Sequence, residues 1–128
     1  MITYIFFIIN TFLFTWYTDK LLNNKMTDGY WHIPQLLMLI GFFLMPIAVA
    51  KYKVQYLIRV ALFGCMFPFL FNTGLNLYRG LPYNHLGKYD FLSFAQTVAL
   101  FAFAIFATVG YEMYERTKQQ LNNLTIKQ

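Results

Sequence analysis

The sequence predicts an all-α membrane protein with four transmembrane helices in an antiparallel bundle. Of its 128 residues, 59% are apolar and 21% aromatic, whereas only 12% are charged, about half the share usual in soluble domains. A chain of this length cannot bury so much apolar surface in water. The second observation is the presence of four long apolar stretches, none of which alternates with the period of a barrel strand. A lipid bilayer is therefore the predicted solvent.

The four stretches cover residues 2–17, 33–50, 54–71 and 91–112. Each is close to the length needed to cross a hydrocarbon core of about 30 Å as a helix. Helices satisfy their own backbone hydrogen bonds, as a water-free environment requires. We expect one domain over residues 1–118, followed by a polar, mobile tail at 119–128.

The first stretch is expected to stay in the protein as a helix rather than act as a signal peptide. It has no basic residues before it and no small-x-small cleavage site after it, and it closes on Trp16 and Tyr17, as an interfacial aromatic belt would. Asn10 and Thr11 lie at its middle and are expected to face another helix.

The second and third stretches are joined by a very short link at residues 51–53, which predicts an antiparallel hairpin. Pro34 suits a first helical turn, and Pro46 is expected to kink or end the second helix. Arg59 lies about one turn inside the third stretch. We expect its side chain to extend to the headgroup layer beside the link.

The fourth stretch carries no charge before Glu112, and Asp90 is its predicted N-cap. Ser93 is interpreted as an early helical residue. Glu112 is expected to pair with Arg116, four residues later. Small residues that permit close packing against a neighbouring helix recur at Ala95, Ala99, Ala102 and Ala107.

Basic residues set the predicted topology. With four crossings, the N-terminus, the 51–53 link and the C-terminal tail share one side, which carries Lys51, Lys53, Arg59, Arg116, Lys118 and Lys127. The other side carries Lys20, Lys25, Arg79 and Lys88. This excess predicts that both termini are cytoplasmic. The expected location is a bacterial inner membrane or a lipid-containing virion.

The net charge of +5 is spread along the chain without a dense patch, so no nucleic-acid partner is expected. The single cysteine, Cys65, cannot form a disulfide within the chain. The expected partners are the lipid bilayer and either further copies of the chain or other membrane proteins.

Two segments, 18–32 and 72–90, are expected on the outer side. Three glycines, a proline and three asparagines in residues 72–90 predict a structured loop with defined turns. The candidate polar cluster on this side consists of His32, Asn72, Asn76, His85 and Asp90.

Two imidazoles and a carboxylate in this cluster match a hydrolytic metal site, or an acid and base for headgroup chemistry. The simpler interpretation assigns His32 to an aromatic belt, His85 to a turn and Asp90 to a helix cap. No HExxH motif, paired carboxylates or Cys–His set is present. We therefore predict no catalytic residue, no metal and no cofactor.

Residues 76–90 resemble a segment of small uncharacterised integral membrane proteins of Bacteroidota and their phages. That segment reads NL-x-x-G-x-P-x-x-YLG, followed by Ser and Asp, and it is matched by Asn76, Leu77, Gly80, Pro82, Leu86, Gly87 and Asp90. His85 stands in place of the usual Tyr, and Tyr89 in place of the Ser. The resemblance implies a phage or mobile-element setting and no mechanism.

The leading functional hypothesis is a non-enzymatic component of a membrane assembly that acts by packing. One alternative is a holin-like lysis protein, because small size, several spans and a polar basic tail fit that type. A second alternative is an envelope enzyme that uses His32, His85 and Asp90 at the outer face.

Overall fold

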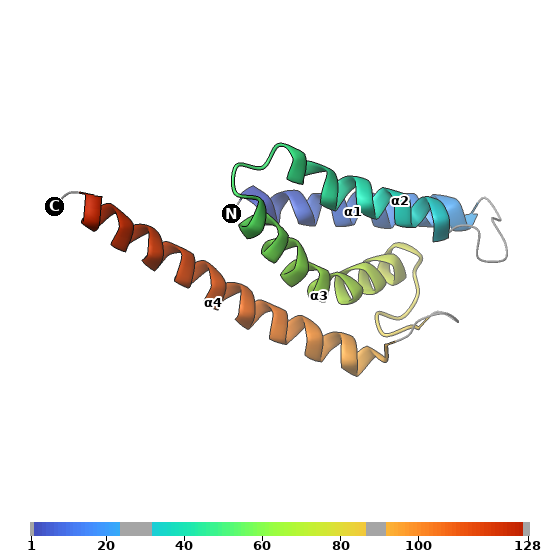
Figure 1. The fold of residues 1–128 in the computed structure, drawn as a ribbon. Coiled ribbons are helices and arrows are strands. Elements are labelled where there is room, and N and C mark those ends of the chain that lie inside the picture. The colour runs from blue at the N-terminus through green and yellow to red at the C-terminus, as the bar shows by residue number, and fades with distance from the viewer. Residues whose placement is uncertain (1, 24–31, 87–91, 127–128) are drawn as a thin grey trace.

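A computed structural model describes residues 2–23, 32–86 and 92–126. It contains four α-helices and one short 3-10 helix: α1 (Ile2–Asn23), α2 (His32–Leu44), η1 (Met45–Ala48), α3 (Lys53–Tyr78) and α4 (Phe94–Ile126) (Figure 1). Among the described residues there is no strand, which confirms the all-α prediction.

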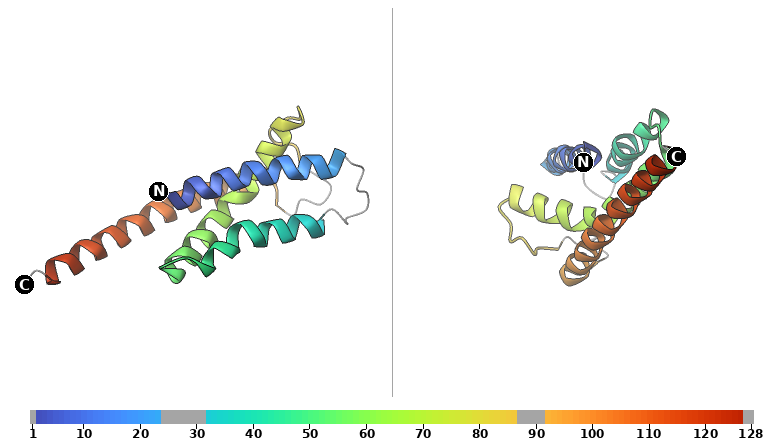
Figure 2. Two further views of the ribbon diagram at one scale, coloured as in Figure 1. Left: turned by 90° about the horizontal axis from the view of Figure 1, so that it is seen from above. Right: turned by 90° about the vertical axis from the view of Figure 1, so that its left-hand side faces the viewer.

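The helices form a row in which α2 packs on α1, α1 on α3, and α3 on α4. The N-terminus, the η1–α3 link and the C-terminal end of α4 lie at the same end of this row (Figure 1). The far end of α4 projects beyond the other helices (Figure 2). Consecutive helices therefore run in opposite directions, as the short link predicts.

Helix ends in α1, α3 and α4 differ from the predicted boundaries. α1 continues to Asn23, and α3 continues to Tyr78, so the first part of the predicted 72–90 loop is helical. α4 begins at Phe94 and remains helical through Ile126, across most of the segment predicted to be a mobile tail. Polar residues with good helix propensity extend a helix into water without needing a partner.

A reciprocal capping box starts α4. The Gln96 amide donates to Ser93 Oγ over 3.2 Å, and the Ser93 amide donates to Gln96 Oε1 over 2.9 Å. These two bonds satisfy backbone donors that have no partner inside the helix. Ser93 is thus the cap rather than an ordinary helical residue, and the predicted cap, Asp90, lies outside the described residues.

Two prolines shape α2 and α3. α2 ends at Leu44, and Pro46 lies in the first turn of η1, which confirms that Pro46 ends the helix. Pro68 lies inside α3, which bends along its length (Figure 1). A proline removes one backbone donor and its ring pushes against the preceding turn, so Pro68 accounts for the bend.

An aromatic cluster joins α1, α2 and α3. Phe7 of α1 is fully buried, and its ring centroid lies 5.5 Å from that of Phe43 in α2 and 5.1 Å from that of Phe63 in α3. Further along the same interface, Phe14 packs against Phe67 over 5.4 Å. Ring pairs at these separations stabilise a core beyond the area they bury.

The exposed face of α1 is apolar, whereas its buried face mixes polar residues with Phe7 and Phe14. Between Ile5 and Trp16, every exposed side chain is apolar: Ile5, Phe6, Ile8, Ile9, Phe12, Leu13 and Trp16. The buried polar residues of the helix are Asn10, Thr11, Thr15, Thr18 and Asp19. On the surface of a water-soluble protein, a helix would instead expose its polar residues. The expectation that Asn10 and Thr11 face another helix is confirmed.

The polar groups on this buried face find partners in their own helix. Thr11 Oγ1 donates to the Phe7 carbonyl over 2.9 Å, and Thr15 Oγ1 donates to the Thr11 carbonyl over 2.8 Å. Asn10 Nδ2 donates to the Phe6 carbonyl over 2.8 Å. Bonds of this kind let hydroxyl and amide groups lie between helices without water.

By length and composition, two of the described helices can cross a membrane: α3, with 26 residues, and α4, with 33. The sequence predicts four crossings. α2 has only 13 residues before η1 takes over, and the buried polar residues of α1 lower its mean hydropathy. α1 and α2 thus fall short for separate reasons: α2 is too short, and α1 is not apolar enough.

The two faces of α1 provide a matched test of this packing. We expect Phe7→Ala to lower the free energy of unfolding by about 3–5 kcal/mol, because it leaves a cavity in the aromatic cluster. Phe12→Ala removes the same atoms from a side chain that is 69% exposed and should change stability by less than about 1 kcal/mol. Unfolding in mixed micelles, followed by circular dichroism, measures both; equal losses would contradict the assigned faces.

Candidate functional site

The structure describes the side chains of three residues of the candidate polar cluster: Asn72, Asn76 and His85. Asn72 and Asn76 lie one turn apart in α3, whereas His85 is exposed in the segment that follows. His32 is the first residue of α2, and its side chain lies outside the described part, as does Asp90. Asn76 and His85 are the two members that the structure brings into contact.

Asn76 organises the turn after α3. Its side chain is buried, and Nδ2 donates to the carbonyls of His85 over 2.7 Å and Tyr83 over 3.3 Å. Its own carbonyl accepts from the Leu81 amide over 2.8 Å. Gly80 has a φ of 68°, a conformation that favours glycine. The contact with His85 therefore uses the backbone of His85 and not its imidazole.

These bonds give a structural meaning to part of the 76–90 resemblance. Asn76 holds two carbonyls, Gly80 turns the chain, and the Pro82 carbonyl accepts from the His85 amide over 2.9 Å. Asn76 and Gly80 thus need their residue types to build the turn. They maintain a shape, and none of these contacts presents a reactive group.

No three His, Cys, Asp or Glu side chains gather closely enough to hold a metal ion within residues 2–23, 32–86 and 92–126. The chemistry of the described part of the chain therefore lies in its ion pairs and its apolar surfaces.

One ion pair lies at the same end of the row as the 76–86 turn. Asp19, near the end of α1, is 5% exposed. Its Oδ1 lies 3.8 Å from Nε of Arg79, the residue directly after α3. The sequence placed Asp19 in an outer segment, because the apolar stretch ends at Tyr17. The helix continues past that point and carries Asp19 to the α1–α3 contact.

A second ion pair joins α3 to α4 at the opposite end. Arg59 Nε lies 2.6 Å from Glu112 Oε1, and Arg59 Nη2 lies 3.1 Å from Glu112 Oε2. Tyr4 of α1 donates its hydroxyl to Glu112 Oε1 over 2.8 Å. Three helices therefore meet at one carboxylate. A two-pronged arginine–carboxylate contact fixes both orientation and distance.

The prediction for the partner of Glu112 is corrected by this pair. Glu112 takes Arg59, not Arg116, as its partner, and the Arg59 side chain points to α4. Because α3 and α4 are antiparallel, a residue in the second turn of α3 lies beside one far along α4. Two lone opposite charges at matching depth in antiparallel apolar helices are the sequence signal for this contact.

Comparison of the chain with protein-family models, with curated proteins and with solved structures gives no match in any of the three. Function must therefore be argued from the described residues themselves.

A double-mutant cycle tests the Arg59–Glu112 contact. We expect Arg59→Gln and Glu112→Gln to show a coupling free energy of about 1–3 kcal/mol, since both groups share one hydrogen-bonded pair. The control cycle of Glu112→Gln with Arg116→Gln should give less than about 0.5 kcal/mol. Equilibrium unfolding in mixed micelles supplies both values, and a larger coupling in the control cycle would contradict the structure.

A second variant tests the turn after α3. Asn76→Ala removes both bonds to the turn carbonyls, and we expect amide exchange at Leu81 and His85 to accelerate roughly tenfold, in keeping with about 1–1.5 kcal/mol of lost hydrogen bonding. Hydrogen exchange measured by mass spectrometry reports it. Asn84→Ala, at an exposed position of the same turn, should leave these rates unchanged, and an equal effect of the two variants would refute the role of Asn76.

Proposed function

We propose that the chain is a four-span integral membrane protein that acts by packing, as a component of a membrane assembly. The observation that carries the proposal is the exposed face of α1, which presents isoleucine, phenylalanine and leucine, while Asn10, Thr11, Thr15, Thr18 and Asp19 are buried. Such a surface is stable in hydrocarbon and unstable in water.

The lengths of α1 and of α2 together with η1 also fit a crossing of the membrane. α1 has 22 residues and spans about 33 Å, while α2 and η1 together have 17 residues and span about 28 Å. Both are near the thickness of a hydrocarbon core of about 30 Å. α4 is longer, about 50 Å, so its C-terminal part would project into water on the side of both termini.

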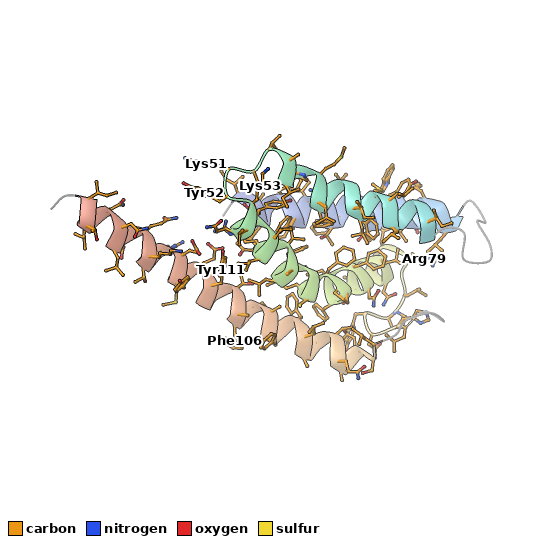
Figure 3. All side chains as sticks on the ribbon, in the orientation of Figure 1. Lys51, Tyr52, Lys53, Arg79, Phe106 and Tyr111 are labelled. Carbon is orange, nitrogen blue, oxygen red and sulfur yellow. The ribbon has the colours of Figure 1, made fainter. Side chains whose placement is uncertain are left out.

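The outer face of α4 supports association with another membrane helix. Three of its small residues, Ala95, Ala99 and Ala102, are exposed rather than packed on α3. Phe106 also lies on the side away from α3, whereas Tyr111 lies towards it (Figure 3). Small residues beside a projecting ring allow two helices to approach closely in lipid. Within residues 2–23, 32–86 and 92–126, no helix covers these alanines.

The basic residues favour a cytoplasmic position for both termini. Because Glu112 compensates Arg59, the charges that bias this end are Lys51, Lys53, Arg116, Lys118 and Lys127. The resemblance at residues 76–90 favours a phage or mobile-element setting, and hence a bacterial inner membrane or a virion membrane.

Site-directed crosslinking in membranes tests the assembly. In a Cys65→Ala background, we expect Ala99→Cys to give a discrete crosslinked dimer with a short bismaleimide, because this face of α4 contacts the same face of a second copy, which supplies the second thiol. Phe12→Cys, on the lipid-facing side of α1, should give none. A chain that crosslinks at neither position, or equally at both, would argue against an assembly through α4.

The membrane potential of expressing bacteria separates packing from lysis. A packing component should leave the potential unchanged at expression levels that give the crosslinked product. A sudden collapse of the potential would overturn the proposal in favour of a holin-like protein.

A further inference from the structure

An apolar groove separates α2 from α3. Although η1 and a short link join these helices, they diverge and leave an open cavity of about 300 Å³. Its sides are formed by Leu39, Ile40 and Leu44 of α2 and by Val60, Gly64 and Phe67 of α3. Phe43 and Phe63 form its floor, and Phe7 of α1 packs against both rings from behind. The groove therefore opens away from α1, towards the surroundings of the protein.

Contacts between α2–η1 and α3 define the floor and one end of the groove. Phe43 lies 5.9 Å from Phe63 and 6.0 Å from Phe67, centroid to centroid. The Tyr56 hydroxyl donates to the Phe43 carbonyl over 2.8 Å, at the end of α2. Gly64 lies in the wall, and a Cβ placed there would meet no atom within 4 Å. The missing side chain of Gly64 thus contributes to the width of the groove.

Positive charge lies at the end of the groove nearest the η1–α3 link. Lys51, Tyr52 and Lys53 gather there, at the end of the row opposite Arg79 (Figure 3), and all three are exposed. Lys53 begins α3 and Val60 follows seven residues later, about 10 Å along the helix. No Asp or Glu occurs between residues 29 and 89, so no carboxylate of α2, η1 or α3 competes for these lysines.

We propose that the groove binds one acyl chain of an anionic phospholipid whose headgroup lies against Lys51 and Lys53. The inference rests on the proposed membrane location, which places the groove in hydrocarbon and the two lysines at the headgroup layer. An apolar wall without polar groups accepts an acyl chain, because an unfilled groove forfeits the dispersion contacts of its lining. The lysines select the headgroup by charge, and Tyr52 lies at the level where aromatic residues meet lipid headgroups.

Native mass spectrometry tests the proposal with purified full-length protein in mixed micelles of phosphatidylglycerol and phosphatidylcholine carrying the same chains. We expect one phosphatidylglycerol to be retained preferentially. Gly64→Leu fills the groove and should remove most of the retained lipid. Gly110→Leu is the matched control, since Gly110 is also an exposed helical glycine with nothing within 4 Å of an added Cβ, and it should retain lipid normally.

The headgroup is tested separately. Lys51→Gln and Lys53→Gln should each lower the preference for phosphatidylglycerol about fivefold, since a basic residue near a membrane surface contributes about 1 kcal/mol towards an anionic lipid. Because these are surface changes, they test the site even if Gly64→Leu impairs folding. Equal retention by Gly64→Leu and Gly110→Leu, or equal retention of the two lipids by the unaltered protein, would overturn the proposal.

The same preparations separate this proposal from the membrane assignment. Protein that stays with the membrane fraction after an alkaline carbonate wash, but shows no groove-dependent lipid, refutes the lipid site alone. Protein released by the wash refutes the membrane location, and with it the lipid site.

Discussion

The α1–α3 interface depends on one constraint: the polar side chains buried on α1 must find partners inside the protein. Along α1, hydroxyl and amide groups turn inward and bond to carbonyls one turn earlier. An outward position for the same groups would be favourable in water and costly in hydrocarbon. The apolar outer face of α1 and its buried polar residues are what the proposed membrane location requires.

Charged groups obey the same constraint. Asp19 and Arg79 meet at one end of the row, and Arg59 and Glu112 meet at the other. Both pairs involve α3 or the residue that follows it, and α3 packs against both α1 and α4. The two ion pairs therefore hold α1 and α4 against opposite ends of α3. Phe7 and Phe14 fill the middle of the α1–α3 contact. In apolar surroundings such pairs specify helix register, because an unpaired charge is costly.

The sequence predicted the fold class and the stop at Pro46, because composition and proline chemistry are local signals. It placed helix ends too early at Tyr17 and Phe71, because hydropathy falls where the helix still continues through partnered polar residues. Only part of the role of Asn76 could be predicted. Its position one helical turn from Asn72 follows from the spacing, but its bonds to Tyr83 and His85 depend on how the chain turns back after α3. The Arg59–Glu112 pair joins residues 53 positions apart and follows from packing, which no short window of sequence contains.

The most direct test of the proposed four crossings is cysteine accessibility in intact cells, with one cysteine at a time in a Cys65→Ala background. Lys20→Cys and Asn84→Cys should react with a membrane-impermeant maleimide added outside, whereas Lys51→Cys and Lys118→Cys should react only after the membrane is permeabilised. Labelling of Lys20→Cys and Lys51→Cys from the same side would contradict the account, because α2 would then not cross the bilayer.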